Sequence, residues 1–223
     1  MFYDLIIISQ SRESLWSLTQ QTIDTARRDT DQINVIVVET GEPHQYEGMD
    51  KQLIYEGRFC YNKALNMGLD HCRGDVHIMA NNDIIFHPGW SKIGELMKAN
   101  DVHSASAFAG HLTRFGYQEG DRMYEGYNVG YTFTGWCLFA DRYCIEQIGR
   151  LDETVSFWYS DNLYALQLEE AGIRHAMFCN VKVDHICSKT LQKQPSRIQR
   201  QYQLGELGKF MQRKRYYAQR KKH

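Results

Sequence analysis

The sequence predicts an α/β fold in which a mostly parallel sheet is flanked by helices. Short runs that are apolar at nearly every position are typical of strands buried on both faces. Segments with apolar residues at helical spacing lie between these runs, and such alternation forms parallel sheets through right-handed crossovers. The composition is ordinary for a globular protein, with 43% hydrophobic and 24% charged residues. The 223 residues suffice for one domain and a short extension.

The first half of the chain shows this alternation most clearly. The predicted strands lie at 3–9, 33–38, 76–80 and near 102–108. The predicted helices lie at 13–27, 58–71 and near 89–99. Ligands of such sheets bind beyond the carboxyl ends of the strands. Glu39 and Asp83 are both expected at that edge.

The second half is less regular. Residues 110–130 contain five glycines and four aromatic residues, and we expect either a solvated insertion or a mobile flap over a site. The remaining expected elements are a strand at 131–140, helices at 143–148 and 161–171, and strands at 173–178 and 181–184. The helix at 161–171 should stop at Gly172, and the last strand leads to His185.

Several classes of protein are excluded by what the sequence lacks. No two of the six cysteines form the CxxC pair of a structural zinc site, and no HExxH motif is present. The longest aliphatic run, Leu5–Ile8, is far shorter than the roughly 20 residues of a membrane span. The first residues lack the basic segment of a signal peptide, so we expect a cytoplasmic location, in the host if the protein is viral.

The charge is unevenly distributed. The whole chain has a net charge of −1, but residues 189–223 hold 11 Lys and Arg against a single acid, Glu206. The preceding residues are therefore acidic overall. The basic segment is therefore considered separately from the acidic part of the chain.

The segment Asn81-Asn82-Asp83 offers candidate metal ligands. Carboxylate and amide oxygens suit Mg²⁺ or Mn²⁺, and one or two carboxylates suffice when phosphates complete the coordination shell. The alternative is a simple turn, because Asn and Asp favour turns.

The order of motifs along the chain is more informative than any single motif. The chain begins with a buried strand at 5–9, continues with a helix, and reaches a second strand at 35–39 that ends in an acid. The motifs that follow are Asn62-Lys-Ala64-Leu-Asn66-Met-Gly68, Gly74-Asp75, Asn81-Asn82-Asp83, Thr134-Gly135-Trp136, Ile148-Gly149-Arg-Leu151-Asp152-Glu153, Phe157-Trp-Tyr-Ser-Asp161, Glu170-Ala171-Gly172 and His185-Ile-Cys-Ser188. In this order, over residues 1–190, the chain resembles the family-2 glycosyltransferases of the GT-A fold.

The resemblance implies one GT-A domain at 1–190, with a nucleotide-sugar-binding half (1–100) and an acceptor and catalytic half (101–190). Residues 191–223 are then a basic C-terminal extension. The implied reaction is a metal-dependent, inverting transfer of a sugar from a nucleotide-sugar donor, most often UDP-linked in the family, to an acceptor hydroxyl.

The resemblance also implies roles for single residues. Asp161 would be the general base that deprotonates the acceptor, and Asp83 and His185 would bind Mn²⁺ or Mg²⁺. The implied donor-binding residues are Glu39, Asn62, Asn81, Asn82 and Asp83, and the implied acceptor or sugar residues are Gly135, Trp136, Trp158 and Ser160. Two positions depart from the family pattern: Asn81 replaces the first acid of Asp-x-Asp, and Ser160 replaces the acid before Asp161.

The acceptor is left open by the sequence. Residues 209–223 combine seven Lys and Arg with two adjacent tyrosines, which suits DNA, an anionic membrane surface or the chain's own acidic body. A solvated segment without a specific role is a further alternative. The candidate nucleic-acid contacts are Lys209, Arg213, Lys214, Arg215 and Arg220.

Two acceptors fit the implied enzyme. One is a hydroxymethylated base in DNA, as in some bacteriophage enzymes, and the other is a cell-surface glycan or lipid-linked precursor. A non-catalytic module that binds nucleotide sugars or nucleic acid on the same scaffold is the remaining alternative. The sequence does not determine the oligomeric state.

Overall fold

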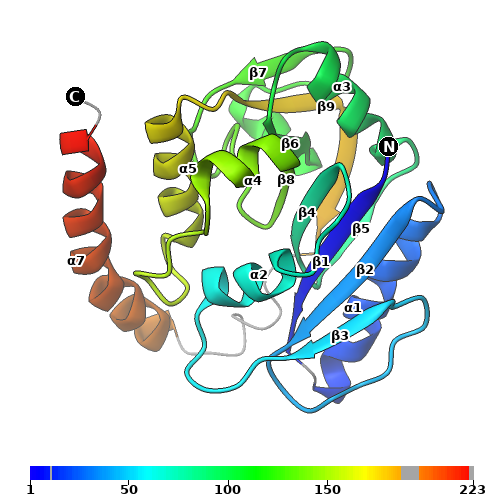
Figure 1. Ribbon diagram of the computed structural model, residues 1–223, viewed down its shortest axis with the longest axis horizontal. Helices are drawn as coiled ribbons and strands as arrows, with labels where there is room; N and C mark the ends of the chain where they lie inside the picture. Colours follow the sequence, from blue (N-terminus) through cyan, green and yellow to red (C-terminus); the bar gives the residue numbers. More distant parts are fainter. Residues whose placement is uncertain (11, 187–195, 221–223) are drawn as a thin grey trace.

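A computed structural model describes residues 1–10, 12–186 and 196–220. Its centre is a sheet with helices on both faces (Figure 1). Four parallel strands form the first part of the sheet, in the order β3-β2-β1-β4. Their bounds are β1 Tyr3–Ser9, β2 Ile33–Glu39, β3 Lys51–Ile54 and β4 Val76–Asn81. This part matches the expected parallel sheet.

The second part of the sheet is mixed. Its strands are β5 Ile84–Phe86, β6 Ser104–Phe108, β7 Met123–Glu125, β8 Cys137–Asp141 and β9 His175–His185. Among the described residues, β8 runs antiparallel to β4 and β6, and β5 and β7 run antiparallel to β9. The expectation of a mostly parallel sheet therefore holds for the first four strands and for the pair of β6 and β9, which run parallel to each other, whereas β5, β7 and β8 are the antiparallel members.

Helices cover the two faces of the sheet. Their bounds are α1 Glu13–Arg27, α2 Tyr61–Leu69, α3 Ile93–Ala99, α4 Arg142–Ile148, α5 Ser160–Ala171 and α7 Ser196–Arg220. Two short 3₁₀ turns are η1 Trp90–Lys92 and η2 Gly110–Phe115. Alternate residues of β1 point to opposite faces. Leu5 and Ile7 pack in the core beneath α1 and α3, whereas Ile6 and Ile8 pack beneath α2, α4 and α5.

Local sequence explains several helix ends. The Asp141 side chain accepts a hydrogen bond from the Cys144 amide and caps α4. Gly172, at φ 67°, ends α5 in the left-handed conformation that glycine adopts without strain, as the sequence predicted.

Other elements differ from the expectation. The predicted strand at 131–140 begins only at Cys137, and the predicted strands at 173–178 and 181–184 form one strand, β9. The expected loop at 110–130 contains η2 and β7. β3 was not predicted, because its side chains are largely exposed and lack an apolar run.

The helix α7 lies beside α5 at one end of the molecule (Figure 1). It lies within the predicted extension 191–223, and part of that segment falls outside the described residues. Over the described part of the chain, no helix combines the length and apolar character needed to cross a bilayer.

Candidate functional site

Asp83 and His185 come together at the end of β4. Asp83 lies in the turn between β4 and β5, and His185 ends β9, which pairs with β5 in the register Ile84 to His185. His185 Nε2 lies 3.1 Å from Asp83 Oδ1, and both side chains are largely buried. Strand pairing therefore joins two residues that are far apart in sequence.

The geometry of this pair fits a metal ion. His185 Nε2 is buried yet makes no hydrogen bond to any described residue. Buried polar atoms are normally satisfied, so an orphaned nitrogen beside a carboxylate is informative. An imidazole nitrogen and a carboxylate oxygen are both metal ligands, and Mn²⁺ accepts such a set. Trp136 stacks on the His185 ring with 5.2 Å between centroids and limits its orientation.

The neighbouring polar residues mainly bind one another. The Asn82 side chain donates to Thr19 Oγ1 (3.1 Å), and Asn81 Oδ1 accepts from the Tyr61 hydroxyl (2.8 Å). Thus Asn81 and Asn82 shape the turn, and Asp83 is the residue of this motif whose carboxylate meets His185.

Glu39 ends β2 at the same edge but is fully buried. Its carboxylate accepts hydrogen bonds from the Gly41 amide (3.1 Å) and the Tyr46 hydroxyl (3.5 Å). The Tyr46 hydroxyl also forms a hydrogen bond with Ser9 Oγ (3.3 Å), and Ser9 Oγ forms another with Thr19 Oγ1 (3.1 Å). Since Thr19 also contacts Asn82, a buried hydrogen-bond chain connects the ends of β2 and β4. Direct contact of Glu39 with a nucleotide stays a prediction.

Asp161 lies in the first turn of α5, against Gly135. Its Oδ1 accepts a hydrogen bond from the Asn162 amide (2.8 Å). Burial raises the pKa of the Asp161 carboxyl above its ordinary value, and hydrogen bonds from the amides of Asn162 and Asp161 only partly offset this effect. A small, largely apolar space of about 10 Å³ beside it is lined by Tyr61, Leu65 and Met79, among others. A carboxylate in this setting is a stronger base than one in water.

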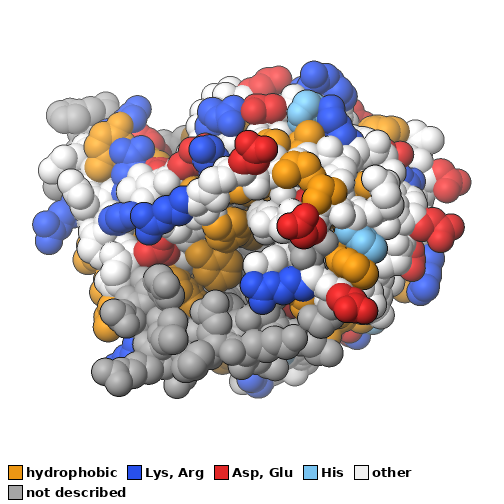
Figure 2. Space-filling view, turned by 90° about the horizontal axis from the view of Figure 1, so that it is seen from below, with side chains coloured by type: hydrophobic (Ala, Val, Ile, Leu, Met, Phe, Trp, Pro, Cys, Tyr) orange, Lys and Arg blue, Asp and Glu red, His pale blue; other side chains and the backbone are white. Residues whose placement is uncertain are grey.

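A larger hollow reaches Asn162, the residue that follows Asp161 in α5. It is a wide depression open to solvent, with a volume of about 530 Å³, and is lined by Tyr117, Tyr127, Asn128, Val129, Tyr131 and Asn162. None of these six side chains carries a charge. Figure 2 views the molecule from the end at which β1 terminates and shows apolar side chains around a depression.

The other predicted site residues have mixed surroundings. Trp136 and Trp158 are partly exposed, and Trp136 also packs against the hydrophobic core. Ser160 is buried, and its carbonyl accepts from the Asn62 side chain (3.3 Å). Asn62 also donates to the carbonyl of Asp152 (2.8 Å), so it braces the segment before α5. Binding of donor or acceptor by these residues stays a prediction.

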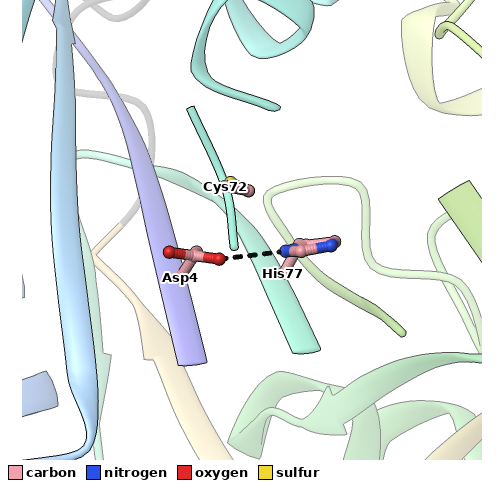
Figure 3. A group of neighbouring side chains, drawn as sticks. All are labelled: Asp4, Cys72 and His77. Carbon is pink, nitrogen blue, oxygen red and sulfur yellow. Dashed lines mark ion pairs between the residues drawn. The ribbon is translucent and has the colours of Figure 1, made fainter. Parts of the chain in front are cut away.

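A second cluster of metal-ligand types lies at the opposite end of the strands. Ligand atoms of Asp4, Cys72 and His77 lie within 4.8 Å of one another (Figure 3). The Asp4 carboxylate, however, already accepts from the Arg73 and Gly74 amides, at 2.7 and 2.5 Å. Burial opposes its ionisation, but hydrogen bonds outweigh burial and lower the pKa of Asp4 to about 2. Burial raises the pKa of the Cys72 thiol, which keeps it protonated. Asp4 thereby anchors the turn before β4, whereas His77 Nδ1, like His185 Nε2, is buried without a hydrogen bond to any described residue.

The basic residues of α7 divide into two groups. Lys209, Lys214 and Arg215 are exposed, as a contact with a polyanion requires. Arg213 instead pairs with Asp152, and Arg220 pairs with Glu170 of α5 at 2.6 Å. Docking of the extension on the chain's own domain, one of the alternatives left open by the sequence, therefore accounts for Arg213 and Arg220.

Sequence reasoning missed several residues that shape the site. Tyr61, Thr19 and Tyr46 were not singled out, because isolated polar residues in a helix or loop carry no distinctive pattern. Glu206 had one signal, as the single acid in a basic segment. Its carboxylate contacts the loop before Asp161.

Comparison with known proteins gives a match at the level of the fold. No family model matches the sequence, and no curated protein matches it. Among solved structures, the crystal structure of GalNAc-T7 with UDP, GalNAc and Mn²⁺ superposes with a TM-score of 0.67 and 11% sequence identity. The chain has the GT-A fold. The similarity covers 83% of this chain and 44% of the GalNAc-T7 chain, so it spans less than half of that protein.

Proposed function

We propose that this chain is a metal-dependent glycosyltransferase that uses a nucleoside diphosphate sugar, UDP-linked in the first instance. The observation that carries the proposal is the pair of Asp83 and His185, with its orphaned nitrogen, at the carboxyl edge of the GT-A sheet. Support comes from GalNAc-T7, whose structure contains UDP, GalNAc and Mn²⁺ on a similar fold. Proteins with the same fold have many different functions, so the function of this chain is inferred from the side chains of the site.

The chemistry follows from the residues around the site. A divalent cation bound by Asp83 and His185 would neutralise the charge that develops on the leaving diphosphate. Asp161, whose pKa is raised by burial, would accept the proton of the acceptor hydroxyl. We infer an inverting reaction, as in family 2, because a base placed beside the acceptor serves a single displacement at the anomeric carbon.

The acceptor is proposed from two surfaces, the hollow that reaches Asn162 and the exposed basic residues of α7. The uncharged hollow that reaches Asn162 suits a neutral group that can stack on tyrosine, either a sugar ring or an extruded base. A glycan needs only this hollow. A base in DNA also needs contacts for the phosphates, which the exposed Lys209, Lys214 and Arg215 would supply. Lys and Arg side chains are visible on the side where α7 lies (Figure 2).

The first experiment is titration calorimetry of UDP with Mn²⁺ or with EDTA. We expect binding to require Mn²⁺, and we expect Asp83→Asn and His185→Ala to weaken it by at least about tenfold. His103→Ala is the matched control, because His103 pairs with Asp141 away from this edge. Equal UDP affinity in EDTA and in Mn²⁺ would rule out the metal role.

A second experiment identifies the reaction. Donor sugars are screened by UDP release with glycan acceptors and with DNA containing hydroxymethylated bases, and the product anomer is read by NMR. Retention of configuration would contradict the inverting mechanism. If transfer to DNA occurs, replacing Lys209, Lys214 and Arg215 by Ala should weaken duplex binding and flatten its salt dependence.

A further inference from the structure

One carboxylate of α7 binds three consecutive backbone amides of the catalytic half. Glu206 accepts hydrogen bonds from the N–H groups of Ser156, Phe157 (3.1 Å) and Trp158 (2.8 Å). Successive amides that converge on one anion fix the backbone of a loop strongly, since hydrogen bonds to a charged group are the stronger class. The segment 156–158 directly precedes α5 and Asp161.

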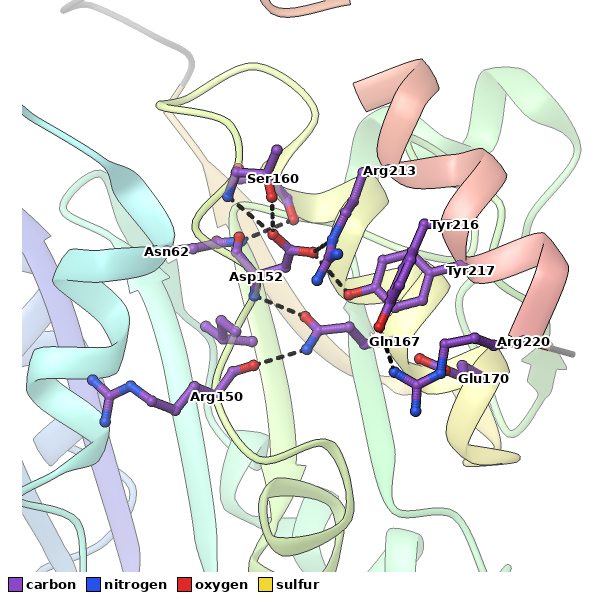
Figure 4. A network of polar contacts seen from close by, with 12 residues as sticks. Asn62, Arg150, Asp152, Ser160, Gln167, Glu170, Arg213, Tyr216, Tyr217 and Arg220 are labelled. Atoms are coloured by element: carbon purple, nitrogen blue, oxygen red, sulfur yellow. Dashed lines mark hydrogen bonds and ion pairs between the residues drawn. The ribbon is translucent and has the colours of Figure 1, made fainter. Parts of the chain in front are cut away.

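Three further side chains of α7 contact the same loop. The buried Asp152 carboxylate accepts from Arg213 and from the Tyr217 hydroxyl (2.8 Å), as Figure 4 shows. The ring of Phe210 stacks on Tyr159, with centroids 4.9 Å apart and planes inclined by 6°. Residues 152–159 are thus contacted by α7 at both ends.

Tyr159 has an unusual backbone conformation. Its φ of 68° lies in the left-handed region, which an aromatic residue adopts only when its surroundings enforce it. Tyr159 is also the residue from which α5 begins, so its conformation sets the direction in which Ser160 and Asp161 leave the loop. Phe210 contacts Tyr159, and Glu206 accepts a hydrogen bond from the Trp158 amide.

We propose that Glu206 is a positioning residue that, by binding the amides of 156–158, sets the location of Trp158 and Asp161 in the site. This inference rests on the proposed function, and it assigns the α7 helix a role inside the enzyme. The same loop is also held from α2, because the Asn62 side chain donates hydrogen bonds to the carbonyls of Asp152 and Ser160. Without Glu206 the three amides lose their common acceptor, while the hydrogen bonds from Asn62 remain.

The first test measures the loop without using activity. Glu206→Gln keeps the shape of the side chain but replaces a carboxylate by one neutral carbonyl. Hydrogen exchange of a peptide covering 150–165 should accelerate about tenfold, since a loss of about 1.4 kcal/mol, close to the worth of one hydrogen bond to a charged group, corresponds to that factor. Arg220→Ala is the matched control: it removes the ion pair between α7 and Glu170, away from the loop, and should leave this exchange unchanged.

The second test connects the loop to turnover. In Glu206→Gln we expect kcat to fall about tenfold or more, because misplacement of a catalytic group by about 1 Å costs on the order of 100-fold. The affinity for UDP and Mn²⁺ should stay unchanged, since Asp83 and His185 are untouched. Glu206→Asp retains the charge and should recover part of both the exchange protection and kcat. A merely structural helix contact would not separate kcat from UDP affinity in this way.

The outcomes are distinguishable. Exchange like that of the wild type in Glu206→Gln would overturn the proposal, and so would faster exchange with unchanged kcat. A wild type that binds UDP with Mn²⁺ but releases UDP from no donor would overturn the proposed function and with it the link to turnover. The exchange data would still decide whether Glu206 binds the loop.

Discussion

Gly135 is the position at which the smallest change should most affect the proposed base. Its backbone is not left-handed, so alanine meets no conformational strain there. A Cβ at this position would lie 2.5 Å from both Cβ and Oδ2 of Asp161, whereas ordinary contacts lie at 3.4–4 Å. Asp161 or the 134–136 turn must therefore move by about 1 Å, which corresponds to a loss of about 100-fold in rate.

The assay for Gly135→Ala compares kcat, UDP affinity and thermal stability. We expect kcat to fall by about 100-fold, UDP affinity to remain within about twofold, and overpacking to lower stability by about 1–3 kcal/mol. That loss lowers the melting temperature by about 2–4 °C per kcal/mol for a chain of this size. Gly110→Ala is the control, since its nearest neighbour, Asp184 Oδ1, would lie 4.0 Å away. Wild-type kcat in Gly135→Ala would refute the placement of the base at Asp161.

Two pH-linked predictions follow. Asp161→Asn should reduce turnover by about 10²- to 10⁴-fold. Because burial raises the pKa of Asp161, ionisation of this carboxyl destabilises the folded wild type, and Asp161→Asn should be more stable at pH 7. The difference in stability should be absent in strong acid and grow as the pH rises above 3.8. Equal melting temperatures of the two proteins across this pH range would contradict the prediction. Burial opposes ionisation of Asp152, but hydrogen bonds from Thr154, Arg213 and Tyr217 outweigh it and lower the pKa below 3.8. The stabilisation from Asp152 should therefore be present above pH 3.8 and lost as the pH falls further. The difference in melting temperature between the wild type and Arg213→Ala should then be largest near pH 7 and shrink as the pH falls below 3.8, and a difference that does not change with pH would contradict this.

The sequence predicted the first half of the fold well. The helix at 13–27 matches α1, and strands β1, β2 and β4 lie within one or two residues of the expected runs. These elements are buried on both faces or amphipathic, so their local pattern reflects their environment. The short strands β3, β5 and β7 were missed, because three or four residues at a sheet edge carry little pattern.

The site was predicted in parts. The order of motifs suggested Asp83, Asp161 and His185 as functional residues, and the structure brings Asp83 and His185 within 3.1 Å. The sequence did not show that Glu39 is buried in a hydrogen-bond chain, because burial of a carboxylate depends on residues from other elements.

By itself the sequence determined the alternation of strands and helices and the acids and amides at the strand ends, since periodicity and turn chemistry are local properties. It also determined the division into an acidic body and a basic extension. Only the tertiary structure decided that Arg213 and Arg220 pair with the body and that Glu206 binds the loop before Asp161. These contacts join residues about 50 or more positions apart, and such pairings depend on how helices pack rather than on any spacing along the chain.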